Sequence, residues 1–258
     1  GTEKGFADLM TRRAKKMGML NSVFANSNGW PHPEHKMSVK DLAILANRIV
    51  ADFPEYYKMF AEETFEFDGR AAANTRNRNP LLGLGIGADG LKTGHTSEAG
   101  YGLVGSALQG ERRVIFVITG LRSQSVRADE AEAIVNWAFR QFTEKKYGRK
   151  NDVIGLAPVW NGASPQVGLA LAEDLNLLVP VFDGDDINFN AEIKTPITAP
   201  LSKGATIGNL IISRPNLPTF KVPLVAAENI GLGGFKEKVF SAANFILRSI
   251  NQSQEAAF

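Results

Sequence analysis

The residues of this chain that are best suited to chemistry lie in one stretch, GIGADGLKTGHT, at positions 85–96. Glycines followed by Lys and Thr are typical of a loop that binds phosphate. In such a loop, however, the lysine directly follows the last glycine and stands at the start of a helix. Here Leu91 separates Gly90 from Lys92, and the residues that follow have the pattern of a strand. The nucleotide-binding interpretation therefore fails on sequence and on context.

A Lys-Thr-Gly triplet has a second chemical meaning, on an edge strand beside a serine active site. There it accompanies a Ser-x-x-Lys motif, as in β-lactamases and penicillin-binding proteins. On such a strand the ammonium group of Lys92 would keep the site positive, and the hydroxyl of Thr93 would bind a substrate carboxylate. Gly94 would leave room for a peptide to lie close to the backbone. Three residues recur by chance, so the triplet alone identifies no site.

The sequence around the triplet predicts three antiparallel strands. Residues 91–97, 101–107 and 112–120 have strand-like composition, and a Gln-Gly pair is a hairpin signal between the last two. The third strand is apolar from residue 114 to residue 118, which is typical of a central strand covered on both faces. Lys92 would then project from a strand at the edge of the sheet.

Hydrophobic spacing predicts helices on both sides of these strands in the sequence. Residues 3–18 have apolar positions at helical intervals, and Ser38 is an N-cap signal for a second helix. A third helix is expected over residues 129–142. Its inward face would consist of Ala133, Ile134, Trp137, Ala138 and Phe142. The first 150 residues therefore combine helices with an antiparallel sheet.

Composition and charge limit the remaining possibilities. The 258 residues include no cysteine, which excludes disulfides and thiolate metal sites, and a net charge of +2 gives no reason to expect nucleic acid as a partner. Residues 1–150 carry 22 basic and 17 acidic side chains, whereas residues 151–234 carry 4 basic and 8 acidic ones. This change of sign predicts a domain boundary between Lys145 and Asp152.

The second part of the chain predicts a small all-β domain over residues 151–234, because short strand candidates alternate with turns. Three aspartates in it, Asp183, Asp185 and Asp186, are interpreted as a polar turn, since no glutamate completes a calcium loop. Residues 235–250 place their apolar side chains on one helical stripe. This helix either packs on its own protein or lies in a membrane interface.

Longer stretches carry a resemblance that the triplet alone does not. They read, in chain order, FANSNGWPHPEHKMSVKDLAILA, TRNRNPLLG, ADGLKTGHTSEAGYGLVGSA, RADEAEAIVNWAF and APLSKGATIGNLII. In this order they resemble the low-molecular-mass penicillin-binding proteins, the D-alanyl-D-alanine carboxypeptidases, over nearly the whole chain. The resemblance implies an α/β (α+β) penicillin-recognising serine transpeptidase-like domain with an antiparallel sheet. A small all-β domain and a C-terminal amphipathic helix would follow it.

The resemblance also implies a substrate cleft. Its residues would be Lys92, Thr93, Gly94, His95, Arg78 and Arg127. Lys92 would be the catalytic-strand lysine and Thr93 the hydroxyl that binds the substrate carboxylate. The two arginines would lie beside the cleft, with a structural salt bridge as the alternative for each. For His95 the alternative is a structural role.

The sequence departs from the family at the nucleophile. No serine is followed by Lys three residues later, and Ser-x-Asn occurs only at residues 249–251, in the terminal helix. The chain is therefore expected to be the C-terminal part of a carboxypeptidase. Residues 1–150 would be part of the peptidase domain, 151–234 the β-rich domain and 235–258 an anchor helix and tail. Alone it is expected to be inactive, because the nucleophile and its base must lie within hydrogen-bond reach.

The function implied by the resemblance is removal of the terminal D-alanine from peptidoglycan stem peptides, with β-lactam antibiotics as ligands and with no metal or organic cofactor. A companion N-terminal polypeptide or segment would carry the nucleophile. The protein would be periplasmic, on the outer face of the inner membrane, held there by its C-terminal helix. Two alternatives remain. One is a class A β-lactamase, against which the extra β-rich domain argues, and the other is a non-catalytic peptidoglycan-binding or scaffolding fragment.

Overall fold

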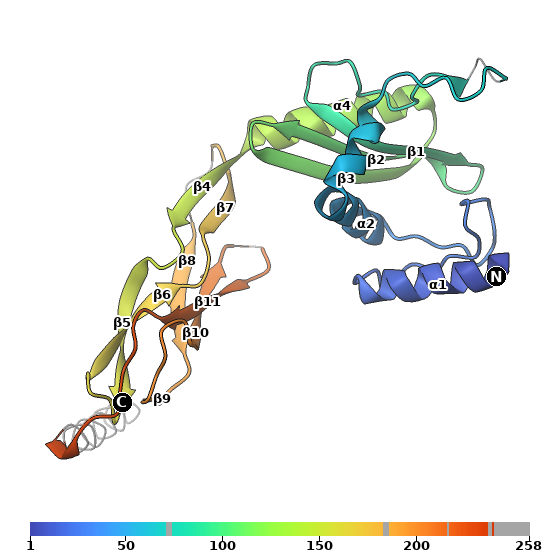
Figure 1. Ribbon diagram of the computed structural model, residues 1–258. Coiled ribbons are helices and arrows are strands. Elements are labelled where there is room, and N and C mark those ends of the chain that lie inside the picture. Colours follow the sequence, from blue (N-terminus) through green and yellow to red (C-terminus); the bar gives the residue numbers. More distant parts are fainter. Residues whose placement is uncertain (71–73, 183–185, 216, 237–238, 240–258) are drawn as a thin grey trace, which may run out of the picture. The chain divides into compact units, whose positions relative to one another are not determined.

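The computed structural model describes residues 1–70, 74–182, 186–215, 217–236 and 239 (Figure 1). The chain divides into two compact units, Gly1–Gln141 and Phe142–Phe258. The elements of the first unit are α1 (Glu3–Lys16), α2 (Val39–Asp52), α3 (Pro54–Tyr57), the 3-10 helix η1 (Lys58–Ala61), β1 (Ala88–Thr96), β2 (Gly100–Gln109), β3 (Arg112–Leu121) and α4 (Gln124–Gln141). Those of the second unit are β4 (Phe142–Gly148), β5 (Val153–Trp160), β6 (Gln166–Leu171), β7 (Leu175–Pro180), β8 (Asn188–Ile193), β9 (Ile197–Thr198), β10 (Thr206–Ser213) and β11 (Phe220–Ala226).

Strands β1, β2 and β3 form an antiparallel sheet in that order. The three predicted strands are confirmed, and among the described strands β2, not the third strand, lies between the other two. β3 is nevertheless covered on both faces. Ile115 packs in a cluster with residues of α2, whereas Phe116 and Ile118 pack in a cluster with residues of α4. A strand between two helical layers needs apolar side chains on both faces, whatever its place in the sheet order.

Helix α4 covers the sheet with small side chains. Its buried positions include Ala131, Val135 and Ala138, and the first two pack in one cluster with Leu103 of β2. The predicted inward face is wrong at Ala133 and Trp137, which are exposed, Trp137 by 57%, and at Phe142, which begins β4 and does not lie on the helix. The periodicity was compatible with either assignment. Bulky strand residues already fill the interface between α4 and the sheet. The helix therefore packs on the sheet through alanine and valine, and its tryptophan lies on the other side of the helix.

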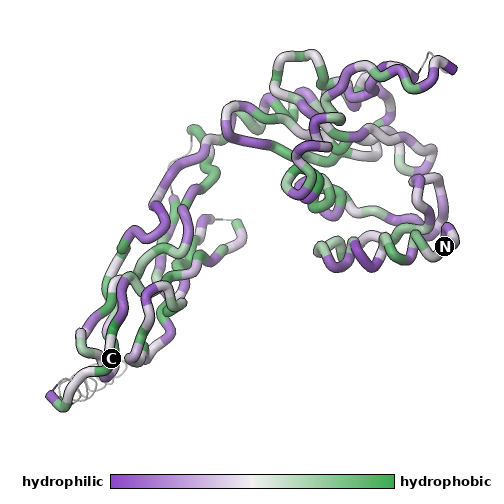
Figure 2. Tube along the Cα trace, viewed as in Figure 1, coloured by the Kyte–Doolittle hydropathy of each residue, from purple (hydrophilic) through white to green (hydrophobic). Residues whose placement is uncertain are grey.

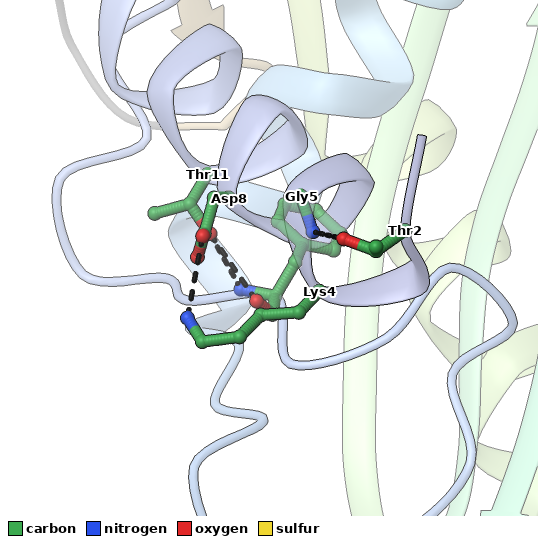
Figure 3. A network of polar contacts seen from close by, with 6 residues as sticks. Thr2, Lys4, Gly5, Asp8 and Thr11 are labelled. Atoms are coloured by element: carbon green, nitrogen blue, oxygen red, sulfur yellow. Dashed lines mark hydrogen bonds and ion pairs between the residues drawn. The ribbon is translucent and has the colours of Figure 1, made fainter.

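Local hydrogen bonds fix where α1 and α2 begin. The hydroxyl of Thr2 accepts a hydrogen bond from the backbone N–H of Gly5 at 3.1 Å, which caps α1 (Figure 3). Further along α1, the hydroxyl of Thr11 accepts from the backbone N–H of Phe24 at 3.0 Å and so ties the helix to the following loop. The predicted N-cap of α2 is confirmed, because the hydroxyl of Ser38 accepts from the third residue of the helix.

The second unit is built from strands in its described part. A six-stranded sheet has the order β8-β10-β11-β6-β5-β9, and β4 pairs with β7 in a two-stranded sheet. Hydrophobic and hydrophilic residues are interspersed along the second unit (Figure 2), and its buried apolar residues form two clusters. β4 pairs with β7, and residues 142–148 accordingly belong to the second unit.

Two expectations for this part of the chain concern residues that lie largely outside the described ranges. Residues 240–258, most of the predicted anchor helix, lie outside the described residues, as do Asp183 and Asp185. In the described ranges, no group of three or more His, Asp or Glu side chains is arranged to hold a metal ion. No helix in those ranges has the length and apolarity that crossing a bilayer requires.

Candidate active site

The Lys-Thr-Gly triplet lies in the middle of β1, at one edge of the three-stranded sheet. Lys92 is paired with Val104 of β2, and its side chain is exposed. Its ammonium group donates a hydrogen bond of 2.7 Å to the carbonyl oxygen of Thr93. The strand conformation excludes a phosphate loop, in which the lysine would begin a helix. It fits the edge-strand interpretation of the triplet.

A cavity of about 460 Å³ lies beside this strand, between α2 and the sheet. The consecutive residues Lys92, Thr93, Gly94 and His95 all contribute to its lining. The facing wall comes from α2 and is apolar, formed by Leu42, Leu45, Ala46 and Ile49. The surface of the cavity is nevertheless almost entirely apolar, and polar atoms contribute only a small part of it. Such a surface suits a largely apolar ligand or segment that also meets a few polar groups.

A polar network holds the beginning of β1. Asp89 forms an ion pair with Arg113 of β3 at 2.7 Å and accepts a hydrogen bond of 2.8 Å from the hydroxyl of Tyr57. The guanidinium group of Arg113 also donates to Ser106 of β2. The network joins all three strands to Tyr57, the last residue of α3. Asp89, its member on β1, lies three residues before Lys92 in the sequence.

The charges of this network are stabilised by one another. Burial alone raises the pKa of Asp89, but hydrogen bonds from Arg113 and Tyr57 outweigh it, so that pKa lies below its usual value. Burial and the hydrogen bond to Asp89 raise the pKa of Tyr57 to about 12. The hydrogen bond to Asp89 also raises the pKa of Arg113. At neutral pH the network therefore contains a carboxylate, a guanidinium and a neutral phenol.

Arg127 lies behind the triplet strand, on α4. It is buried, with 6% of its surface exposed, and an Nη donates to the carbonyl oxygen of Arg78 at 3.4 Å. Its guanidinium group lies 5.9 Å from the ring centroid of Tyr101, and that ring stacks on His95 at 4.0 Å. Burial lowers the pKa of Arg127. Within the described residues the alternative of a structural salt bridge is not realised, because no carboxylate pairs with this guanidinium.

Arg78 reaches the same region by its backbone and not by its side chain. Its guanidinium group is exposed and donates to the side chain of Asn74 at 2.8 Å. The neighbouring Asn79 is buried and donates to the carbonyl oxygen of Gly90 at 2.9 Å. Asn79, and not Arg78, is therefore the residue whose side chain contacts β1.

Sequence reasoning missed the residues that support the triplet strand: Tyr57, Asn79, Asp89, Tyr101, Ser106 and Arg113. Arg113 is a charged residue at the start of an apolar strand, and this was a usable signal, because a charge beside a core element needs a partner. Tyr101 pairs with His95 because of the register of the hairpin. A one-residue uncertainty in the position of the turn prevents the sequence from predicting that register.

Comparisons with known proteins agree with the predicted resemblance. Residues 1–123 match the family model for D-alanyl-D-alanine carboxypeptidases, and residues 142–231 match the model for the C-terminal domain of penicillin-binding protein 5. D-alanyl-D-alanine carboxypeptidase DacC of Escherichia coli is 31% identical over 98% of this chain and 62% of the relative. DacD of the same organism is 29% identical over 90% of this chain and 60% of the relative. The chain therefore spans less than two thirds of the length of these relatives.

Solved structures agree with the predicted fold class. Penicillin-binding protein 5 from Haemophilus influenzae superposes with a TM-score of 0.75 at 29% identity, over 88% of this chain and 66% of that one. The carboxypeptidase DacD from Francisella tularensis gives a TM-score of 0.67 at 27% identity, over 90% and 69% of the two chains. An α/β unit with an antiparallel sheet, followed by a β-rich domain, is thus confirmed, while the terminal helix lies largely outside the described residues.

Proposed function

Because the chain belongs to the D-alanyl-D-alanine carboxypeptidase family of penicillin-binding proteins, we propose that it is the C-terminal part of a serine peptidase of the bacterial cell wall. The substrate is the stem peptide of peptidoglycan, and the reaction removes its terminal D-alanine. The observation that supports this most directly is the cavity beside the edge strand, which Lys92, Thr93, Gly94 and His95 line together.

A peptide substrate binds by adding a strand to the outer edge of β1. Edge strands carry unpaired backbone groups that hold an extended peptide, and side-chain pockets then supply specificity. The hydroxyl of Thr93 binds the terminal carboxylate, and the ammonium group of Lys92 keeps the cleft positive. Apart from its two chain neighbours, no atom of the described residues would lie within 4 Å of a side chain at Gly94, which leaves space for a peptide there. Arg127 adds positive charge from behind the strand.

The nucleophile lies in a part of the protein outside this sequence. Its serine hydroxyl attacks the carbonyl carbon of the peptide bond between the two D-alanines, and backbone N–H groups stabilise the oxyanion. Departure of D-alanine leaves an acyl-enzyme, which water hydrolyses. β-Lactam antibiotics acylate the same serine. The chain alone is inactive, since Lys92 has no serine to act on, and the mechanism requires no metal or organic cofactor.

A companion polypeptide or segment completes the peptidase domain. Two observations support it. The curated relatives extend over more sequence than this chain covers. In addition, within the described residues no strand pairs with the outer edge of β3, although both faces of that strand are covered. An apolar strand with a bare edge associates readily with another strand.

The site of action is the periplasm, where the peptidoglycan substrate is. The C-terminal helix predicted over residues 235–250 holds the protein on the outer face of the inner membrane, as one amphipathic helix can do reversibly. A class A β-lactamase is disfavoured, because residues 142–231 match the C-terminal domain of penicillin-binding protein 5. No observation favours a non-catalytic scaffold over the enzyme.

A fluorescent penicillin tests this proposal. The full-length protein, with its N-terminal part present, should become covalently labelled, whereas the 258-residue chain alone should not. Lys92→Ala should abolish labelling of the full-length protein. Lys15→Ala, which removes an exposed lysine from α1, should leave labelling unchanged. Absence of labelling in the folded full-length protein would contradict the enzyme assignment and favour a binding role.

A further inference from the structure

Tyr101 lies on β2 directly opposite His95 on β1, and two unlike groups contact its ring. The imidazole ring of His95 stacks on it with 4.0 Å between the ring centroids and 33° between the planes. The guanidinium group of Arg127 lies over the ring at 5.9 Å. We propose that Tyr101 is a positioning residue, which fixes the imidazole of His95 at the cavity and is itself held in place by Arg127. The inference rests on the proposed function only in taking His95 as part of the site.

The hairpin register enforces the contact between the two rings. Residues directly opposite in an antiparallel pair have their side chains within contact distance on the same face of the sheet. The turn between the strands is fixed by the hydroxyl of Thr96, which accepts from the backbone N–H of Ala99 at 3.0 Å. Gly100, with φ of 66°, closes the turn so near the end of β3 that an added Cβ would lie 2.9 Å from the carbonyl oxygen of Leu121. The register therefore has little freedom to slip.

Tyr101 is the residue directly opposite His95 in the hairpin, and its ring contacts the imidazole. The pairs that flank His95 and Tyr101 are Gly94 with Gly102 and Thr96 with Gly100, so three of these four neighbours are glycines. An exposed imidazole on such a strand would sample several staggered rotamers. With Tyr101 in place, one orientation is stabilised. His95 is also among the residues that line the cavity.

The contact with Arg127 stabilises the position of the Tyr101 ring. The guanidinium group is buried, and among the described residues its Nε has no hydrogen-bond partner and its one hydrogen bond goes to a backbone carbonyl at 3.4 Å. Burying a cation with so few partners is costly, and the face of an aromatic ring offsets part of that cost. A movement of Tyr101 away from Arg127 would remove this contact. The three side chains therefore behave as one unit, with Tyr101 between the buried cation and the exposed imidazole.

Proton NMR of the histidine rings tests the proposal on the 258-residue chain. The sequence has three histidines, His32, His35 and His95, so each ring can be assigned by its substitution with glutamine. Protons held over the face of an aromatic ring resonate upfield. We expect upfield ring protons for His95 and direct cross-relaxation between its ring and that of Tyr101.

Substitutions of Tyr101 separate positioning from folding. Tyr101→Phe should keep the upfield shift, whereas Tyr101→Leu should return the His95 protons to the positions of an exposed imidazole. Arg127→Met should reduce the shift, because the tyrosine ring loses the group that holds it. His35, which packs edge-on against Phe24 at 5.6 Å, should not change in any of these variants and serves as the internal control.

The inference is overturned if the unmodified chain gives no cross-relaxation between the two rings, a result that does not depend on any variant folding. An unchanged His95 spectrum in a folded Tyr101→Leu variant overturns it as well. Neither result touches the proposed function, which the penicillin experiment tests by itself. Conversely, a failure of penicillin labelling would leave the ring contact measurable.

Discussion

At the scale of single residues, the ion pair between Asp89 and Arg113 is the contact that most directly holds the triplet strand in place. Asp89→Asn should destabilise the first unit by about 2 kcal/mol, because a partly buried guanidinium loses its charged acceptor. Denaturant unfolding followed by tyrosine and tryptophan fluorescence measures this. Asp8→Asn is the matched control, since its ion pair with Lys4 is exposed and should contribute less than about 0.5 kcal/mol. Equal effects of the two substitutions would show that the network has no special role.

The same carboxylate predicts how stability depends on pH. The pKa of Asp89 is lowered in the folded protein, so its contribution is present above the pKa of the unfolded chain, about 4, and is lost as pH falls through the lower folded value. The unfolding free energy of the unmodified chain should therefore fall more steeply below about pH 4 than that of Asp89→Asn. Parallel pH curves for the two proteins would mean that the carboxylate is not stabilised by folding.

At the scale of elements, the sequence predicted local features better than contacts between elements. The three strands, the hairpin and the N-cap of α2 follow from residue types and spacing, and the structure has them. The inward face of α4 and the place of β3 in the sheet depend on what packs against them. A 3.6-residue period allowed Trp137 to face inward, and only the large strand side chains exclude it. The role of Arg78, which was chosen by resemblance, also depends on packing between elements. Its backbone carbonyl contacts Arg127, and the side chain that contacts β1 is that of Asn79.

The seam between α4 and the sheet gives a prediction at this scale. Ala131 is fully buried in that seam, whereas Ala133 faces solvent on the same helix. Ala131→Leu should destabilise the first unit by about 1–3 kcal/mol, because extra methylene groups overfill a close-packed contact. Ala133→Leu adds the same atoms to the exposed face and should change stability by less than about 0.5 kcal/mol. Denaturation midpoints measured in parallel distinguish the two, and a stabilising Ala131→Leu would contradict the assigned face.

At the scale of the whole molecule, what could be predicted is the order of its parts. The family, the α/β unit and the β-rich domain follow from stretches spread along the chain, and the comparisons bear them out. The supporting network of Asp89, Arg113 and Tyr57 could not be predicted, because its members lie far apart in sequence and meet only when β1, β3 and α3 pack together. The absent Ser-x-x-Lys motif is a fact of the sequence, and the proposed companion segment follows from it.

The most direct test of the central claim is the release of D-alanine from a diacetyl-L-lysyl-D-alanyl-D-alanine substrate by the full-length protein. The account predicts release by the unmodified protein. It further predicts that Lys92→Ala lowers kcat/KM by about 10²–10³-fold, as expected when one group that stabilises the transition state is lost. Lys15→Ala, on the exposed face of α1, should leave kcat/KM unchanged. A folded full-length protein that releases no D-alanine, or that releases it equally well without Lys92, would contradict the account.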